Sequence, residues 1–135
     1  MKSRETLIKL RRFEVDEKRQ KVADIEMIIS EFHRMSDDLE RQVKIEQERA
    51  GVSDINHYAY PTFAKAALQR RENLIASITD LKDNLKAAQD ELALAFEELK
   101  KVEMIEERTL ADERNNREHQ EQSQLDEFSA RAYQI

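Results

Sequence analysis

The feature that most limits how this chain can fold is a heptad pattern between Leu74 and Val102. Every position of its four–three spacing is apolar: Leu74, Ile78, Leu81, Leu85, Ala88, Leu92, Ala95, Leu99 and Val102. The positions between them are mostly charged or polar. A narrow apolar stripe that persists over about four heptads is typical of a coiled coil rather than of an ordinary surface helix. Such a stripe cannot bury itself, so a second helix must cover it.

The first fifty residues carry a matching stripe. One series holds Ile8, Val15, Val22, Ile29, Ser36 and Val43, and the other holds Ile25, Phe32 and Leu39. Arg11, Lys18 and Glu46 fill the remaining positions of the second series, and the stripe is ragged near the N-terminus. Because no breaker interrupts the pattern and Ser3 is a suitable N-cap, we expect a first helix over about residues 3–50.

The single glycine and the single proline of the chain both fall between the two stripes. Gly51 suits the position just after a helix, while Pro61 suits the first turn of a new helix and holds Tyr60 extended. We therefore expect a reversal over 51–61 and a second helix over about 62–111. The predicted fold class is all-α, a long two-helix antiparallel coiled-coil hairpin that forms one domain over residues 1–135.

Folding the chain back about residues 55–58 brings the two stripes together. The expected neighbours are Val22 with Ala88 and Leu92, Val15 with Ala95 and Leu99, and Ile8 with Val102 and Ile105. In this register the basic N-terminal segment faces the acidic C-terminal half of the chain, which favours the antiparallel direction.

The last part of the chain, residues 112–135, differs from both arms. Its first thirteen residues, 112–124, contain no apolar side chain. Leu125, Phe128 and Ala132 then return at helical spacing, with Tyr133 beside them. This pattern predicts a polar C-terminal extension, either a solvated helix or a disordered segment, that ends in a small apolar patch.

Two groups of residues are candidates for contact with other proteins. At the reversal, Tyr58, Tyr60 and Phe63 either close the end of the hairpin or form a docking surface, since tyrosine combines a large apolar area with a polar group. At the opposite end we expect one cluster, which either packs locally or inserts into a partner. Its members are Leu7, Leu10, Phe13, Leu125, Phe128 and Tyr133.

Nothing in the sequence predicts catalysis or a cofactor. His33, His57 and His119 stand alone, there is no cysteine, and paired acids are expected on the solvated faces of so acidic a chain. A net charge of −6 with only a diffuse basic start argues against nucleic-acid binding. No apolar run approaches the roughly 20 residues of a membrane span, and the N-terminus has no signal-peptide pattern, so we expect a cytoplasmic protein.

Four segments together resemble one protein family. They are LIKLRRFEVDEKRQKVADIE (7–26), RAGVSDINHYAYPTFAKAALQRRENL (49–74), AFEELKKVEMIEER (95–108) and LDEFSARA (125–132). Together they are similar to the flagellar export protein FliJ family, particularly its alphaproteobacterial form. The reversal and the terminal segment make the resemblance more specific than coiled-coil periodicity alone.

The resemblance implies a non-enzymatic stalk and chaperone component of the flagellar type III export apparatus. In this family the open end of an antiparallel hairpin enters the hexameric export ATPase ring, and the part nearer the reversal contacts the export gate protein FlhA. The family also handles export chaperones. The implied location is cytoplasmic and peripheral to the inner membrane, through partners only.

The same resemblance assigns residues to each contact. The ATPase-ring contact would use Leu7, Leu10, Phe13, Leu125 and Phe128. The export-gate contact would use Leu39, Ile45, Arg49, Phe63 and Ala67, with Tyr58 and Tyr60 as further aromatics. Ile45 and Arg49 stand where better-known members carry aromatic residues.

Two other functions fit a chain of this kind. One is a generic coiled-coil spacer or adaptor, which should associate through exposed stripes and ignore ATPases. The other is the equivalent stalk of a virulence-type secretion system.

Overall fold

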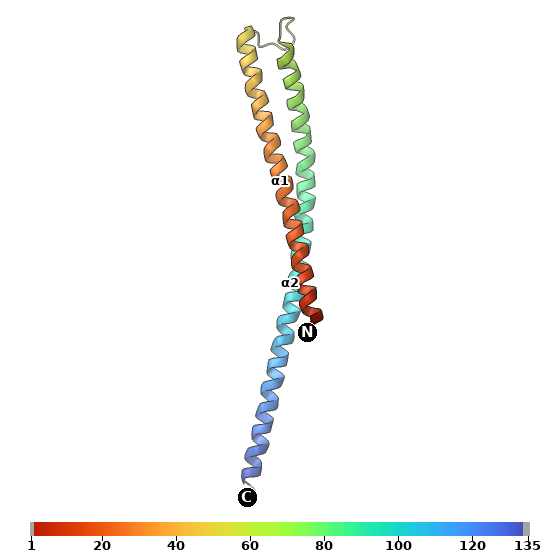
Figure 1. Ribbon diagram of the computed structural model, residues 1–135, viewed down its shortest axis with the longest axis vertical. Helices are drawn as coiled ribbons and strands as arrows, with labels where there is room; N and C mark the ends of the chain where they lie inside the picture. Colours follow the sequence, from red (N-terminus) through yellow and green to blue (C-terminus); the bar gives the residue numbers. More distant parts are fainter. Residues whose placement is uncertain (1, 134–135) are drawn as a thin grey trace. The chain divides into compact units, whose positions relative to one another are not determined.

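The computed structural model describes residues 2–133 and shows two long helices joined by a short reversal (Figure 1). Helix α1 spans Lys2–Ala50, and helix α2 spans Thr62–Tyr133. No strand occurs among residues 2–133. The chain divides into two compact units, one of Asp16–Ala93 and one of the described residues up to Val15 and from Leu94 onward. The predicted all-α antiparallel hairpin is confirmed.

Ion pairs within the unit Asp16–Ala93 fix its register. Lys18 and Lys21 of α1 contact Glu91 of α2 at 3.2 and 3.3 Å, and Arg71 of α2 contacts Glu40 of α1 at 3.7 Å. Early residues of α1 therefore pair with late residues of α2, as in an antiparallel hairpin. This register agrees with the predicted proximity of Val22 and Ala88.

The heptad positions identified in the sequence face inward. Every one of the nine positions from Leu74 to Val102 is buried or half-buried, and the same holds for the matching positions of α1. Even Arg11, Lys18 and Glu46, the polar members of the α1 stripe, are half-buried. Long charged side chains can cover apolar surface with their stems while their charged ends reach water.

The end of α1 is a Schellman motif. Gly51 has φ 68°, the left-handed conformation that glycine adopts without a side-chain penalty. The Val52 amide donates to the Gln47 carbonyl and the Gly51 amide donates to the Glu48 carbonyl, both at 3.3 Å. The last carbonyls of α1 are thereby satisfied where the chain leaves the helix.

Two successive turns carry the chain from α1 to α2. The His57 amide donates to the Asp54 carbonyl, and the Tyr60 amide donates to the His57 carbonyl, each at 3.1 Å. The Asp54 carboxylate also accepts a hydrogen bond from the Asn56 amide at 2.9 Å. Helix α2 begins after Pro61, whose carbonyl accepts the Lys65 amide at 3.1 Å.

The other unit holds the N-terminal end of α1 against the middle of α2. Val15 and Leu99 are buried there, and Arg4 contacts Glu106 at 3.5 Å and Glu113 at 3.4 Å. Ile105, expected beside Ile8, is 59% exposed, while Glu106 is half-buried. The proximity of Ile105 to Ile8 stays a prediction. The heptad count from Leu99 places residue 106 on the inner face, where its carboxylate meets Arg4.

Helix α2 continues without a break beyond the N-terminus of α1 (Figure 1). Of the two alternatives for the C-terminal extension, the structure shows the helix, through Tyr133. Gln134 and Ile135, which belong to the same predicted segment, lie outside the described residues. The helix does not end near residue 111 because no glycine or proline follows and opposite charges recur four residues apart, as at Arg114 and Glu118.

Candidate functional site

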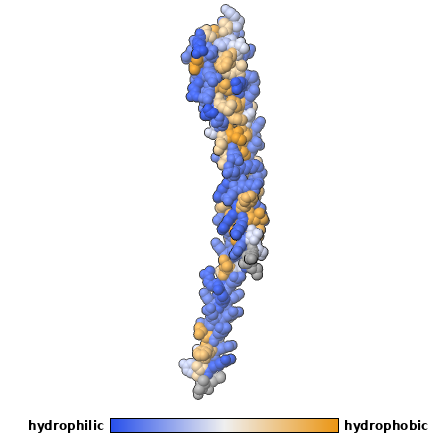
Figure 2. All heavy atoms as spheres, viewed as in Figure 1, coloured by the Kyte–Doolittle hydropathy of each residue, from blue (hydrophilic) through white to orange (hydrophobic). Residues whose placement is uncertain are grey.

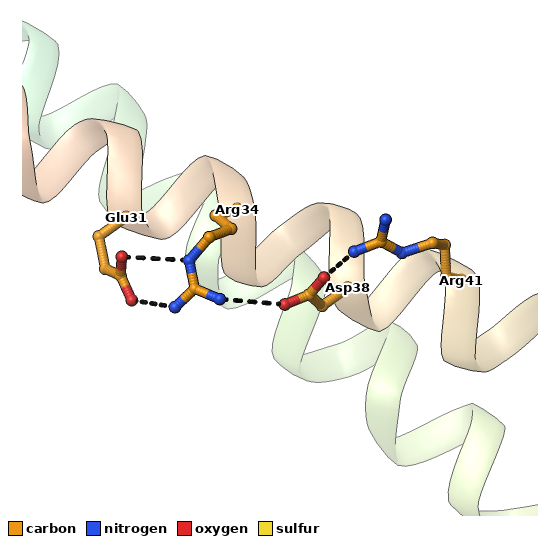
Figure 3. Close-up of polar contacts among 4 residues, drawn as sticks. All are labelled: Glu31, Arg34, Asp38 and Arg41. Atoms are coloured by element: carbon orange, nitrogen blue, oxygen red, sulfur yellow. Dashed lines mark hydrogen bonds and ion pairs between the residues drawn. The ribbon is translucent and has the colours of Figure 1, made fainter.

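Several charged side chains on the surface pair along a single helix. Glu31, Arg34, Asp38 and Arg41 form such a row on α1, shown in Figure 3. The hydrogen bond from Arg34 holds the pKa of Glu31 below its ordinary value, and the pKa of Arg34 is raised by the same contact. Pairs of this kind support a helix modestly and are open to water, so the row stabilises α1 rather than forming a reactive site.

The described part of the chain offers no evident place for a metal or a membrane span. Among residues 2–133 there is no group of three or more histidines or acids placed to hold a metal ion. No helix in that range is long and apolar enough to cross a bilayer.

The residues predicted for the gate contact separate into two sets. Leu39, Tyr60 and Ala67 are buried in one cluster with Val43 and Ala64. The Tyr60 hydroxyl accepts a hydrogen bond from the Gln47 side-chain amide at 2.9 Å, which ties the reversal to α1. These three predicted residues therefore hold the end of the hairpin together.

The other predicted gate residues are exposed. Tyr58 is 97% exposed and stacks on the ring of His57 with 4.6 Å between ring centroids. Phe63 and Ile45 are 57% and 51% exposed. Counted in heptads, Arg49 and Phe63 flank the inner stripe on the same side of the hairpin, and Ile45 lies one position farther out on that side. We name these three residues together with Tyr58 the apical surface.

The sequence did not predict a shallow groove beside this surface. A groove of about 270 Å³ is lined by Phe32, Met35, Arg70, Asn73, Leu74 and Ser77. Met35, Arg70 and Ser77 all occupy the heptad position next to the inner stripe on the side of Phe63. The sequence signal is the serine at position 77, since a small side chain beside the inner stripe leaves part of the space there unfilled.

Leu7, Leu10 and Phe13 form a ridge on α1, each three residues from the next. They are 38%, 49% and 64% exposed. By the register of Arg4 with Glu106, Ile105 of α2 lies across from Leu7. Ile105 also lines a hollow of about 250 Å³ with Lys101, Met104 and Arg108. We name Leu7, Leu10, Phe13 and Ile105 the proximal patch.

Leu125, Phe128 and Tyr133 lie far from this patch. They are 60%, 73% and 92% exposed, and Figure 2 shows apolar residues near the C-terminal end of α2 beyond a largely polar stretch. At ~1.5 Å per residue, Leu125 is about 30 Å along α2 from Ile105. The predicted single cluster at the open end was therefore wrong, because α2 remains helical where α1 has ended. The tail carries a separate distal patch.

One acid accepts two interhelix contacts. The lysine ammonium groups of Lys18 and Lys21, Lys18 foremost, hold the pKa of Glu91 below its ordinary value through hydrogen bonds. The pair of lysines and their shared acid lie on the side of the hairpin that also carries Met35 and Ser77. Their contacts across the two helices set the register of this unit.

Residues 4–134 match the family model described as flagellar FliJ protein. No curated protein and no solved structure matches the chain.

Proposed function

The chain belongs to the flagellar FliJ protein family, a non-enzymatic component of flagellar protein export, and on this premise we propose that it is the stalk that links the export ATPase to the export gate. Residues 1–135 act as one domain. Its partners are the hexameric export ATPase, the gate protein FlhA and export chaperones, and it takes no cofactor or nucleic acid. It is cytoplasmic and reaches the inner membrane only through these partners.

The observation that carries the proposal is the family match over nearly the whole chain, combined with exposed apolar residues at the open end of the hairpin. The proximal patch contains leucine, isoleucine and phenylalanine side chains that the hairpin leaves partly uncovered. A ring of subunits around this end would bury them. We therefore assign Leu7, Leu10 and Phe13 to the ATPase-ring contact, together with Leu125 and Phe128 farther along α2.

The apical surface supports a contact with FlhA. Phe63 and Tyr58 present exposed aromatic rings, the residue type that contributes most to many protein interfaces. Arg49 adds a cation, although its guanidinium contacts Glu46 at 3.2 Å. Leu39, Tyr60 and Ala67 are buried under this surface, and their packing holds the exposed residues around them in position.

The structure suggests how such a stalk acts. Both helices have mostly charged outer faces, so contacts to a surrounding ring are few and exchangeable apart from the apolar patches. A stiff element with weak, unevenly placed contacts can favour one conformation of a subunit over another as the ring turns over ATP. The apical surface remains available for the gate.

The test is ATP hydrolysis and ring assembly of the purified cognate flagellar export ATPase, with and without this protein. We expect stimulation at one copy per ring or fewer. Phe13→Ser should abolish it, whereas Met27→Ser should leave it intact. The two side chains make a matched pair, because they are 64% and 70% exposed and occupy the same heptad position on α1.

Absence of binding and stimulation, with the protein helical, would refute the stalk proposal and favour a spacer or adaptor. Stimulation of a virulence-type ATPase in preference to the flagellar enzyme would favour the second alternative. Equal loss of activity in the two variants would show that exposed apolar area matters in general rather than the proximal patch.

A further inference from the structure

The C-terminal part of α2 carries a stripe on the side away from α1. Counted in alternate steps of three and four residues, its positions are Met104, Glu107, Ala111, Arg114, Glu118, Glu121, Leu125 and Phe128. The seam with α1 runs through Leu99, Val102 and Glu106, which lie on the opposite side of the helix. All positions of the stripe are exposed except Ala111, which is half-buried. A second helix could therefore cover the stripe without displacing α1.

The stripe is apolar at its two ends and mostly charged between them. Met104, at one end, is 61% exposed, and Leu125 and Phe128, at the other, are 60% and 73% exposed (Figure 2). A helix that covers all of it must be apolar at both ends and carry complementary charges in the middle. A second copy of the same helix, placed antiparallel, meets both conditions.

One antiparallel register joins the apolar ends and pairs the central charges. When Met104 faces Phe128 of the second copy, Arg114 faces Glu118 of that copy, and symmetry repeats both contacts on the other side of the two-fold axis. Met104 also borders the hollow of about 250 Å³, which leaves room for an aromatic ring. The remaining levels of the stripe set Leu125 beside Glu107 and Ala111 beside Glu121, where the glutamate stems can cover apolar surface while their carboxylates reach water.

The residues that flank the stripe agree with this register. Glu103 lies across from Arg131 of the second copy, in the flanking relation that Lys21 and Glu91 have in the hairpin itself. Arg117 meets its own copy at the two-fold axis, the one like-charge contact of the arrangement. Within residues 2–133, no ion pair occupies the residues that would form the new pairs: Glu103, Arg114, Glu118 and Arg131.

Other arrangements place like charges together along the stripe. A shift of one heptad in one direction sets Glu107 against Glu118 of the second copy, and a shift in the other direction sets Glu118 against Glu121. A parallel pair in register would face every charged residue with its own copy. Charge therefore selects the antiparallel register in which Arg114 meets Glu118.

We propose that the free chain forms an antiparallel dimer through the face of α2 between Met104 and Phe128, with a second copy of the chain as the occupant. At ~1.5 Å per residue the contact runs about 36 Å along each helix. This inference goes beyond the proposed function and does not rest on it. It adds a state in which Leu125 and Phe128 are covered, so the dimer must separate before these residues can contact another protein.

The experiment measures the mass of the full-length chain by sedimentation equilibrium at increasing concentration. The average mass should rise from 16.0 kDa toward twice that value. Leu125→Ala should raise the dissociation constant of the dimer about 10-fold, because each dimer loses the side chain twice. The matched control, Leu94→Ala, should stay within about 2-fold. Leu94 is also an exposed leucine of α2, at 63%, but it lies outside the stripe.

Exchanging the central charges tests the register. Arg114→Glu alone and Glu118→Arg alone should each weaken self-association about 3- to 10-fold, because each places like charges opposite one another. A mixture of the two variants should form a heterodimer at least as tight as the wild-type dimer, since every acid then faces an arginine. An effect within a single helix would not be repaired by mixing.

A cross-link tests the position of the two-fold axis. The chain has no cysteine, so single cysteines can be placed at the neighbouring exposed residues Asn115 and Asn116. Residue 115 flanks the stripe and meets its own copy at the axis, whereas residue 116 lies on the side of the helix that continues the seam. A short bismaleimide should therefore link Asn115→Cys into dimers much more efficiently than Asn116→Cys.

The outcomes separate this inference from the proposed function. A mass that stays at 16.0 kDa up to about 0.2 mM would overturn the dimer, since small interfaces of this class associate weakly but measurably in that range. Equal cross-linking of the two cysteine variants, or no preference for the heterodimer, would overturn the antiparallel register. Dimer formation without stimulation of the ATPase would keep this inference and refute the stalk, whereas a monomer that stimulates the ATPase would do the reverse.

Discussion

Replacing Tyr60 should destabilise the fold, whereas replacing Tyr58, the other tyrosine of the reversal, should leave its stability almost unchanged. Tyr60 is 8% exposed and lies in the cluster with Leu39 and Val43, whereas Tyr58, two residues earlier, is 97% exposed. Replacing each by alanine therefore removes a similar side chain from a buried and from an open environment. Sequence composition alone does not distinguish them.

The magnitudes follow from the contacts. Tyr60→Phe removes the hydrogen bond from Gln47 and should cost about 1 kcal/mol of unfolding free energy. Tyr60→Ala also removes the buried ring. Aromatic-to-alanine changes cost about 3–5 kcal/mol in enclosed cores, and a site between only two helices belongs at the lower end, about 3 kcal/mol. Tyr58→Ala should change stability by less than about 0.5 kcal/mol.

The assay is urea denaturation of the full chain, followed by circular dichroism at the helix band. We expect the transition midpoint to fall in the order wild type, Tyr60→Phe, Tyr60→Ala, with Tyr58→Ala coinciding with wild type. In the same samples Tyr58→Ala should weaken binding to the cytoplasmic part of FlhA. A Tyr60→Ala midpoint within error of wild type, or an equal loss in Tyr58→Ala, would refute the assignment of Tyr60 to the core.

Three further predictions concern the hairpin itself. Because Lys18 and Lys21 lower the folded-state pKa of Glu91, its contribution to stability is complete above the ordinary value near 4.5 and is lost as pH falls through the lowered value. When the pH is lowered from 7 to 3, the free energy of unfolding measured with urea should therefore fall less for Glu91→Gln than for the wild type. Equal falls in the two proteins would contradict this. Gly51→Ala should lower the free energy of unfolding by about 1 kcal/mol, because alanine is strained at a φ of 68°. No clash contributes, since nothing lies within 4 Å of an added Cβ. An unchanged denaturation midpoint would mean that α1 ends in another conformation. Ala64→Leu should cost about 1–3 kcal/mol in the same assay, because Ala64 is 0% exposed and a larger side chain would push the helices apart; a gain in stability would show that the end of the hairpin is underpacked.

Much of the fold followed from local patterns. The nine heptad positions from Leu74 to Val102 all face inward, and the antiparallel direction was predicted from the place of the reversal and the opposite charge of the two ends of the chain. These features could be predicted because helix periodicity places residues three and four apart on one face, whatever lies opposite. Gly51 and Pro61 mark the reversal for equally local reasons.

The sequence left open which candidate residues near the reversal are buried. Leu39, Tyr60 and Ala67 were expected to contact a partner and are buried in the hairpin, while Ile45, Phe63 and Tyr58 are exposed. The sequence shows that a loop residue is aromatic, but it does not show whether the side chain points into the core or toward solvent. Only the path of the chain between Gly51 and Thr62 decides which side of the loop is covered.

The open end shows the same limit. Leu10 and Leu125 were placed in one cluster because both are apolar and both lie near a chain end. The sequence permitted either helix or disorder beyond residue 111, and that choice sets the distance between them. A helix carries Leu125 away at ~1.5 Å per residue, so the two patches cannot meet.

The sequence by itself determined the element type, the inner face of each helix and the place of the reversal, because these depend on spacing along one chain. The tertiary structure decided which charged side chain meets Glu106, which tyrosine supports the reversal, and how far the distal patch stands from the proximal one. These depend on what lies across from a residue. Burial is a property of two surfaces in contact, and only the folded chain brings the second surface into place.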